Sequence, residues 1–241
     1  MEWHCVRLQL HGRERRMARV RVLVAIFVSW VTAAASLPAA VLRAGHARSG
    51  CLRLGSALCA FTWEVSPAED ARWMQEALRL AKLGGAATAP NPQVGCVIVD
   101  VDNQEIGRGY HPCAGAPHAE IFALRDAGVV VDREVEDEQY WTVDTGDVSL
   151  AGATAYVTLE PCSHVGRTPP CCDAFISAGI GRVVVGMSDP APWVSGQGID
   201  RLRSAGIRVD VGVEKAACAE INADWIAGVL KLPNDSSDPT T

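Results

Sequence analysis

Three side chains that bind soft metals stand far apart along this chain, and a fold that uses them together must bring them to one point. His118 opens the motif His118-Ala119-Glu120, and Cys162 and Cys171 follow later with eight residues between them. One imidazole and two thiolates form a three-ligand zinc site whose fourth position is open to water, as in catalytic zinc sites. Glu120 then has a role, because a carboxylate beside that water can carry its proton.

The other cysteines leave alternatives to this zinc site. The chain has nine cysteines, an odd and scattered set that is not typical of a small disulfide-bonded secreted domain. Cys171 stands at the expected start of a helix, where the helix dipole favours the thiolate. Cys172 is expected to pack elsewhere, although an exchange of the two as ligands stays open. A closed structural site would need Cys113 or Cys172 as a fourth ligand.

The spacing of these motifs narrows the chemistry further. HxE followed by PCxxC is the signature of zinc nucleobase deaminases, but here eight residues replace the two between the cysteines. The strings NPQVGCVIV, GRGYHPCAGAPHAE and TLEPCSHVGRTPPCCDA resemble closely the deaminase domain of the riboflavin pathway, in which the longer spacing is the family pattern. The resemblance covers roughly Ser66 to Leu232.

This resemblance implies an α/β protein with a three-layer α/β/α cytidine-deaminase-like fold and a mixed central sheet. It also implies hydrolytic, zinc-dependent deamination of 2,5-diamino-6-ribosylamino-4(3H)-pyrimidinone 5′-phosphate to the 5-amino-6-ribosylamino-pyrimidinedione phosphate, an early step of riboflavin biosynthesis. Zn²⁺ is the expected cofactor, and Glu120 is the expected catalytic residue. The alternatives are another cytidine- or adenosine-type base deaminase, or a non-catalytic zinc-binding partner subunit.

The same resemblance assigns the substrate contacts. Asn91 and His111 are expected on the pyrimidine side, and His164, Arg167 and Asp189 around the ribosyl phosphate. Each of three residues has a simpler alternative: a strand-end surface histidine for His111, a solvated loop charge for Arg167 and a turn or helix-capping residue for Asp189.

Helical and strand patterns alternate through the body of the chain. Ser66 and Glu69 predict a capping box at the start of a helix that runs to Gly84, and the next two strands predict a hairpin. The acidic segment 130–150 is expected to be a solvated surface loop. The alternation predicts a mixed sheet covered on both faces. We expect strands at 94–101, 105–110, 153–159, 182–187 and 207–213, and later helices at 118–127, 171–178, 198–204 and 214–230.

The first 62 residues are expected to be a targeting leader. A basic start, the apolar run 20–31 and small residues at 33–40 are typical of a signal peptide, with a membrane anchor as the alternative. Residues 41–62 contain arginines and no acidic side chain, as transit peptides do. A signal peptide followed by a transit segment resembles the two-part leaders of algae with secondary plastids, so we expect an organelle, a plastid ahead of a mitochondrion, with mitochondrial targeting or plain secretion as the alternatives. A deaminase domain is expected over residues 63–232, followed by a polar tail at 233–241.

Charge restricts the partners of the chain. Residues 1–62 hold nine arginines and two glutamates, so the body is much more acidic than the formal net charge of -6 suggests. An acidic body repels phosphate backbones, which favours a small-molecule pyrimidine ribosylamino phosphate over nucleic acid. No membrane contact is expected of the mature form, and a homodimer is compatible with the sequence. The chain ends soon after the domain, so a separate reductase is expected for the next step.

Overall fold

The computed structural model describes residues 65–133, 139–191 and 194–231. The expected leader, 1–62, and the polar tail, 233–241, lie outside these residues. Among the helices of the described part, the longest has 15 residues, and none is long and apolar enough to cross a membrane.

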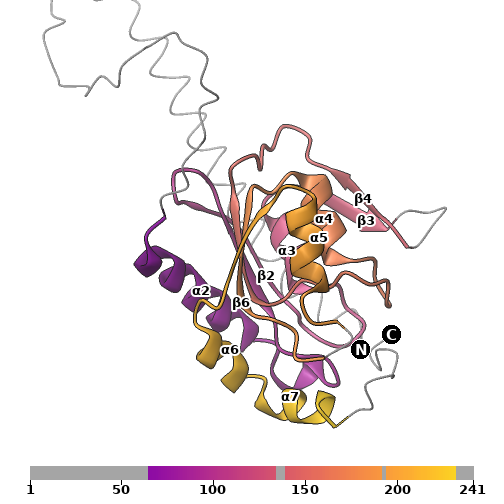
Figure 1. The fold of residues 1–241 in the computed structure, drawn as a ribbon. Helices are drawn as coiled ribbons and strands as arrows, with labels where there is room; N and C mark the ends of the chain where they lie inside the picture. Colours follow the sequence, from indigo (N-terminus) through magenta and orange to yellow (C-terminus); the bar gives the residue numbers. More distant parts are fainter. Residues whose placement is uncertain (1–64, 134–138, 192–193, 232–241) are drawn as a thin grey trace, which may run out of the picture. The chain divides into compact units, whose positions relative to one another are not determined.

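Five strands form one mixed sheet in the order β2-β1-β5-β6-β7 (Figure 1). The strand β1 pairs antiparallel with both β2 and β5, whereas β5, β6 and β7 run parallel to one another. The predicted initial hairpin and the predicted mixed sheet are therefore confirmed. The strands are β1 (Gly95–Val99), β2 (Glu105–Tyr110), β5 (Thr154–Leu159), β6 (Arg182–Met187) and β7 (Arg208–Val211).

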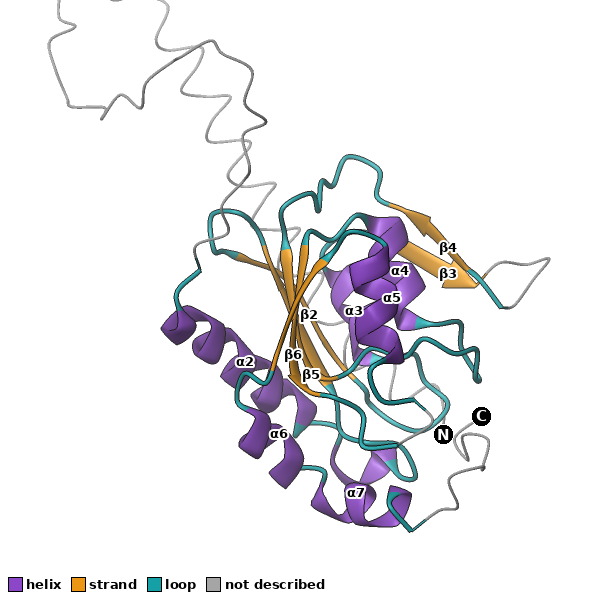
Figure 2. Cartoon of the chain, in the orientation of Figure 1, coloured by secondary structure: helices purple, strands orange, loops and turns teal. Residues whose placement is uncertain are grey.

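Helices cover both faces of this sheet, as Figures 1 and 2 show. Successive side chains of a strand point to opposite faces of the sheet, and in β1 both sets are apolar. Cys96 and Ile98 belong to the apolar cluster on one face, and Val97 and Val99 belong to the cluster on the other. The expected three-layer α/β/α fold is confirmed. One face carries α3 (Ala119–Asp126), α4 (Cys171–Ala178) and α5 (Gln197–Ser204), and the other carries α2 (Pro67–Ala81) and α6 (Lys215–Glu220).

The ends of α2, β5 and β6 lead into the region where the functional residues lie. The 3₁₀ turn η2 (Gly85–Thr88) follows α2. The capping box expected at the start of α2 is present, because the side chains of Ser66 and Glu69 each accept from the other's backbone N–H. Cys162 follows the carboxyl end of β5, and Asp189 follows the carboxyl end of β6. In open α/β sheets this edge is where ligands bind.

The single helix expected over 214–230 is wrong. The segment forms α6 and a second helix, α7 (Ala223–Val229), and the chain turns between them at Asn222. The buried Asn222 side chain accepts from the backbone N–H of Gln93 at 2.8 Å and donates to its carbonyl at 2.9 Å. At Asn222 the chain bonds to Gln93 and does not continue as one helix. The two bonds join the C-terminal helices to the loop before β1.

The acidic segment was expected to be a solvated loop, and that expectation is also wrong. It contains two antiparallel strands, β3 (Val130–Arg133) and β4 (Trp141–Asp144), that pair as a small second sheet. Val131, Trp141 and Leu150 are buried in the same apolar cluster as α3 and α4. The acidic side chains of the two strands are exposed, so the hairpin has one apolar and one charged face.

Candidate metal centre and substrate pocket

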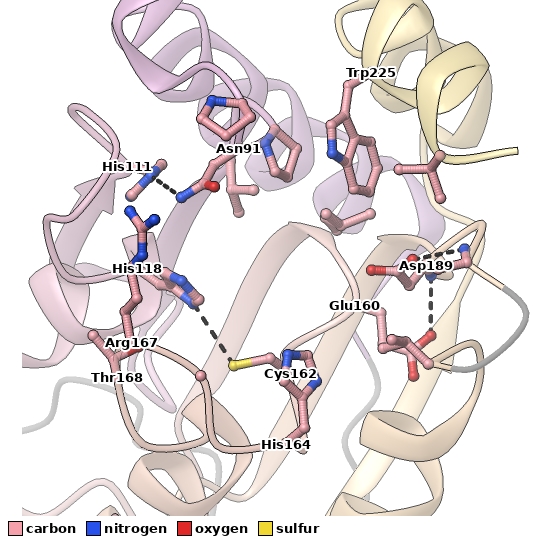
Figure 3. Close-up of a pocket in the computed structure, with 18 of the residues that line it drawn as sticks. Asn91, His111, His118, Glu160, Cys162, His164, Arg167, Thr168, Asp189 and Trp225 are labelled. Carbon is pink, nitrogen blue, oxygen red and sulfur yellow. Dashed lines mark hydrogen bonds between the residues drawn. The ribbon is translucent and has the colours of Figure 1, made fainter. Parts of the chain in front are cut away.

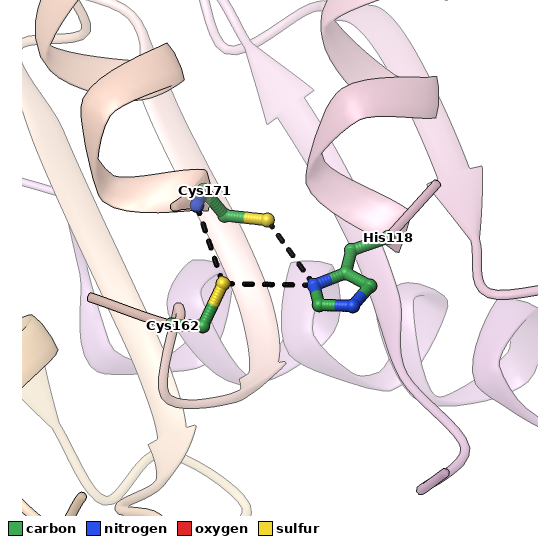
Figure 4. A group of neighbouring side chains, drawn as sticks. All are labelled: His118, Cys162 and Cys171. Carbon is green, nitrogen blue, oxygen red and sulfur yellow. Dashed lines mark hydrogen bonds between the residues drawn. The ribbon is translucent and has the colours of Figure 1, made fainter. Parts of the chain in front are cut away.

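The structure brings His118, Cys162 and Cys171 together (Figure 4). Their ligand atoms all lie within 4.8 Å of one another. The Nδ1 atom of His118 is 3.6 Å from Cys162 Sγ and 3.4 Å from Cys171 Sγ. His118 caps the start of α3, Cys171 begins α4, and Cys162 lies in the loop after β5, so three separate elements supply the set.

This geometry fits a zinc ion. Bond lengths of about 2.0 Å to nitrogen and 2.3 Å to sulfur, at tetrahedral angles, place ligand N and S atoms about 3.5 Å apart. The two N–S separations in the structure agree with that spacing. Zinc also prefers imidazole and thiolate, whereas magnesium and calcium prefer oxygen. The residues present therefore suit zinc in both donor type and spacing.

The electrostatics of the two thiols also favour a cation. Hydrogen bonds from Cys171, together with the neighbouring His118 ring, hold the pKa of Cys162 well below its usual range. Burial, followed by the hydrogen bond with Cys162 and its negative charge, raises the pKa of Cys171 well above its usual range. The pair accordingly holds one negative charge easily, and a divalent cation would stabilise the second.

Cys172 lies apart from this cluster. Its Sγ is 3.3 Å from the carbonyl oxygen of Pro161 and 3.5 Å from that of Gly198, so it faces backbone rather than the three ligand atoms. Its backbone N–H also donates to the carbonyl of Cys162 at 3.2 Å. The adjacent cysteine thus fastens the start of α4 to the loop that bears Cys162.

Glu120 lies in the first turn of α3, beside the three candidate ligands, and it is 3% exposed. Within the described part of the chain, its Oε2 is the one buried side-chain nitrogen or oxygen atom without a hydrogen-bond partner. Burial raises the pKa of Glu120 to about 7. A buried carboxyl group whose pKa is near neutral, and one of whose oxygens has no hydrogen-bond partner, is suited to accept or release a proton.

His111 and Asn91 form a fixed polar pair next to His118. The Nδ2 atom of Asn91 is 3.1 Å from His111 Nε2, and His111 Nδ1 is 3.1 Å from the carbonyl of Pro117. Burial, and then the nearby His118, lower the pKa of His111 to about 4, so the ring is neutral at pH 7. A neutral ring that donates to Pro117 accepts from the Asn91 amide. The oxygen of Asn91 then points away from His111 (Figure 3).

A pocket of about 400 Å³ opens above these groups. In the view of Figure 3, Asn91 and His111 lie on one side of it and Asp189 and Trp225 on the other. All the predicted site residues except the buried Cys171 line this pocket or its floor. The lining includes Asn91, His111, His118, Glu120, Cys162, His164, Arg167 and Asp189.

Trp225 and Glu160 are among the pocket residues that the sequence analysis did not indicate. Trp225, on α7, forms an aromatic wall that no motif indicated. Glu160 is buried, and its carboxylate accepts the backbone N–H groups of Asp189, Gly196, Gly198 and Ile199 at 2.9–3.4 Å. It directly precedes Pro161 and therefore holds the loop after β6 against the loop that bears Cys162. The sequence signal that could have indicated Glu160 was its position directly before Pro161 and Cys162 in the string TLEPC.

Comparison with protein families gives a match over residues 67–187 to the cytidine and deoxycytidylate deaminase zinc-binding region. The chain belongs to this deaminase family. The match spans α2 to the end of β6 and includes every candidate ligand.

Individual relatives narrow the similarity to riboflavin biosynthesis, so the resemblance found in the sequence is confirmed. The chain is 53% identical over 64% of its length to the riboflavin biosynthesis protein RibD of Synechocystis, and 48% identical over 67% to the chloroplastic riboflavin biosynthesis protein PYRD of Zea mays. It spans 36% of each of these proteins. It is 49% identical to the diaminohydroxyphosphoribosylamino-pyrimidine deaminase of Buchnera aphidicola from Acyrthosiphon pisum, over 60% of this chain and 84% of that protein.

A solved structure agrees with these sequence matches. Acinetobacter baumannii RibD aligns with a TM-score of 0.58 at 46% identity, over 69% of this chain and 41% of that one. The similarity thus covers the described domain and less than half of the solved protein.

Proposed function

We propose that the chain is a zinc-dependent aminohydrolase that deaminates 2,5-diamino-6-ribosylamino-4(3H)-pyrimidinone 5′-phosphate, an early step of riboflavin biosynthesis. The observation that carries the proposal is the partnerless Glu120 Oε2, buried on the floor of the pocket beside a His/Cys/Cys cluster. A structural zinc site has no use for such a carboxyl group, whereas a hydrolytic one requires a group that moves protons.

His118, Cys162 and Cys171 would hold the zinc ion. When bound, zinc supplies Lewis-acid activation of a water molecule for attack on the amine-bearing ring carbon. Glu120 takes a proton at Oε2 and delivers it to the departing amine, and its raised pKa of about 7 suits both directions of transfer.

Asn91 and His111 would orient the pyrimidine ring. Since His111 is neutral and bonded to the Asn91 amide, it fixes that side chain with its oxygen free to accept a substrate N–H. The exposed Arg167 and the half-buried His164 also line the pocket and suit a phosphate, and Asp189, on the side opposite Asn91 and His111, suits a ribose hydroxyl (Figure 3).

The relatives support the same choice of substrate. The Buchnera protein of which the chain spans 84% carries the name of this deaminase, while the longer relatives are named for the pathway. Zea mays and Arabidopsis relatives are named as chloroplastic, which supports plastid location for this chain. The homodimer, the separate reductase and the two-part leader stay predictions.

The test is ammonia release by the full chain from the diaminopyrimidinone phosphate, with product identity checked by mass spectrometry. Cytidine and adenosine serve as competitor substrates in parallel reactions. We expect ammonia from the diaminopyrimidinone phosphate alone. Ammonia from cytidine or adenosine at a comparable rate would contradict the substrate assignment, and none from any of the three would contradict the activity.

A further inference from the structure

The β3–β4 hairpin contacts the start of α4 through Trp141. This residue is 9% exposed, and its indole Nε1–H lies 3.1 Å from the carbonyl oxygens of both Pro169 and Pro170. Pro170 caps α4, and Cys171 is the first residue of that helix. The indole therefore binds the two peptide groups that deliver Cys171 to the cluster.

The other strand of the same hairpin contacts α3. Arg125, in the last turn of α3, donates from Nε at 2.8 Å and from Nη2 at 2.5 Å to the carbonyl of Val131. Its Nη2 is also 3.3 Å from Asp132 Oδ1. Since His118 is the N-cap residue of α3 and Cys171 begins α4, the hairpin is bonded both to α3 and to the start of α4.

The strands β3 and β4 are paired, so the contact with α3 and the contact with the start of α4 belong to one unit. Val131 pairs with Val143 and Arg133 pairs with Trp141 across the ladder, and Val131 and Trp141 are both buried against the main core. A paired hairpin with one buried face resists local deformation. A shift of α4 relative to α3 would have to break bonds at one end of the hairpin.

We propose that the β3–β4 hairpin is a brace that fixes the distance between α3 and α4, with Trp141 as the positioning residue for Cys171. The inference rests on the proposed zinc site but adds a role that the ligands themselves do not supply. Partners that orient metal ligands without touching the metal affect affinity by about 10- to 100-fold in characterised sites.

Trp141→Phe tests the brace, because it keeps an aromatic ring in the core and removes only the indole N–H. The matched control is Trp73→Phe on the opposite face of the sheet, where Trp73 Nε1 donates to Asn103 Oδ1 at 2.5 Å. Zinc release to a chromogenic chelator is followed for both variants and the parent. We expect release about tenfold faster or more from Trp141→Phe, and an unchanged rate from Trp73→Phe.

Hydrogen–deuterium exchange on the metal-free proteins supplies a readout that needs no zinc. We expect faster exchange in the peptide over residues 171–175 of Trp141→Phe, with α2 unchanged. Release at the parent rate together with unchanged exchange would overturn the brace, and so would equal acceleration by Trp73→Phe. A parent chain that binds no zinc would contradict the proposed function instead, and the exchange comparison would still decide the brace.

Discussion

A buried ion-pair network at the start of β6 gives the sharpest stability prediction. The Arg182 side chain is 3% exposed, and its Nη1 and Nη2 atoms each donate to a carboxylate oxygen of Asp70 at 2.8 Å. Its Nε donates to Asp210 at 2.7 Å, and the Tyr156 hydroxyl donates to Asp70 at 2.8 Å. Because Asp70 lies on α2, the network fastens that helix to the edge of the parallel strands.

Arg182→Ala leaves Asp70 buried, with the Tyr156 hydroxyl as its remaining partner in this network. Removal of one member of a buried charge pair costs about 3–5 kcal/mol, because the other charge stays desolvated. Arg201→Ala is the matched control, since Arg201 bonds Asp173 in a similar two-atom geometry at the surface, where its side chain is 47% exposed. Exposed pairs contribute about 1 kcal/mol or less.

Urea unfolding followed by circular dichroism measures the two free energies of unfolding. The chelator-treated proteins are compared, because bound zinc would add its own linkage term to the stability of each. We expect Arg182→Ala to lose at least about 2 kcal/mol more than Arg201→Ala, with unchanged m values. Equal losses from the two variants would refute the argument that burial makes the Arg182 pair critical.

Three further changes test the site. Glu120→Gln is expected to keep zinc, measured by elemental analysis, and to lose more than about 100-fold in kcat, because the amide cannot carry the proton; a loss below about tenfold would contradict its role. Arg167→Ala is expected to raise KM about tenfold or more for the phosphorylated substrate and to change little with the dephosphorylated analogue, whereas equal effects on both would make Arg167 a loop residue. Gly198→Ala would place a Cβ atom 2.0 Å from the Pro161 carbonyl oxygen, so α5 must move. Calorimetry should show a loss of about 1–3 kcal/mol in the free energy of unfolding. A free energy of unfolding equal to that of the parent would show that the contact can relax without cost.

Much of the fold was predictable because its signals are local. The Ser66 and Glu69 capping box lies within four residues, and the apolar run of β1 is typical of a strand buried on both faces. The convergence of His118, Cys162 and Cys171 was predictable for a different reason. Their residue types form a zinc ligand set only if they meet, so the motif itself indicated the contact.

The features that sequence reasoning missed depend on distant partners or on mixed composition. Asn222 interrupts the last helix because it bonds Gln93, which no local pattern indicates. In the acidic segment, Val131 and Trp141 are buried, but the charges between and around them concealed the short alternation of apolar and polar residues. The orientation of Cys172 toward backbone carbonyls likewise depends on loops from elsewhere in the chain.

X-ray absorption at the zinc edge of the zinc-loaded chain tests most directly the claim of an open, water-accessible centre. We expect two sulfur ligands at about 2.3 Å, from Cys162 and Cys171, and two nitrogen or oxygen ligands at about 2.0 Å, from His118 and water. Three sulfur ligands would mean that another cysteine closes the site, and they would contradict the proposed hydrolytic centre.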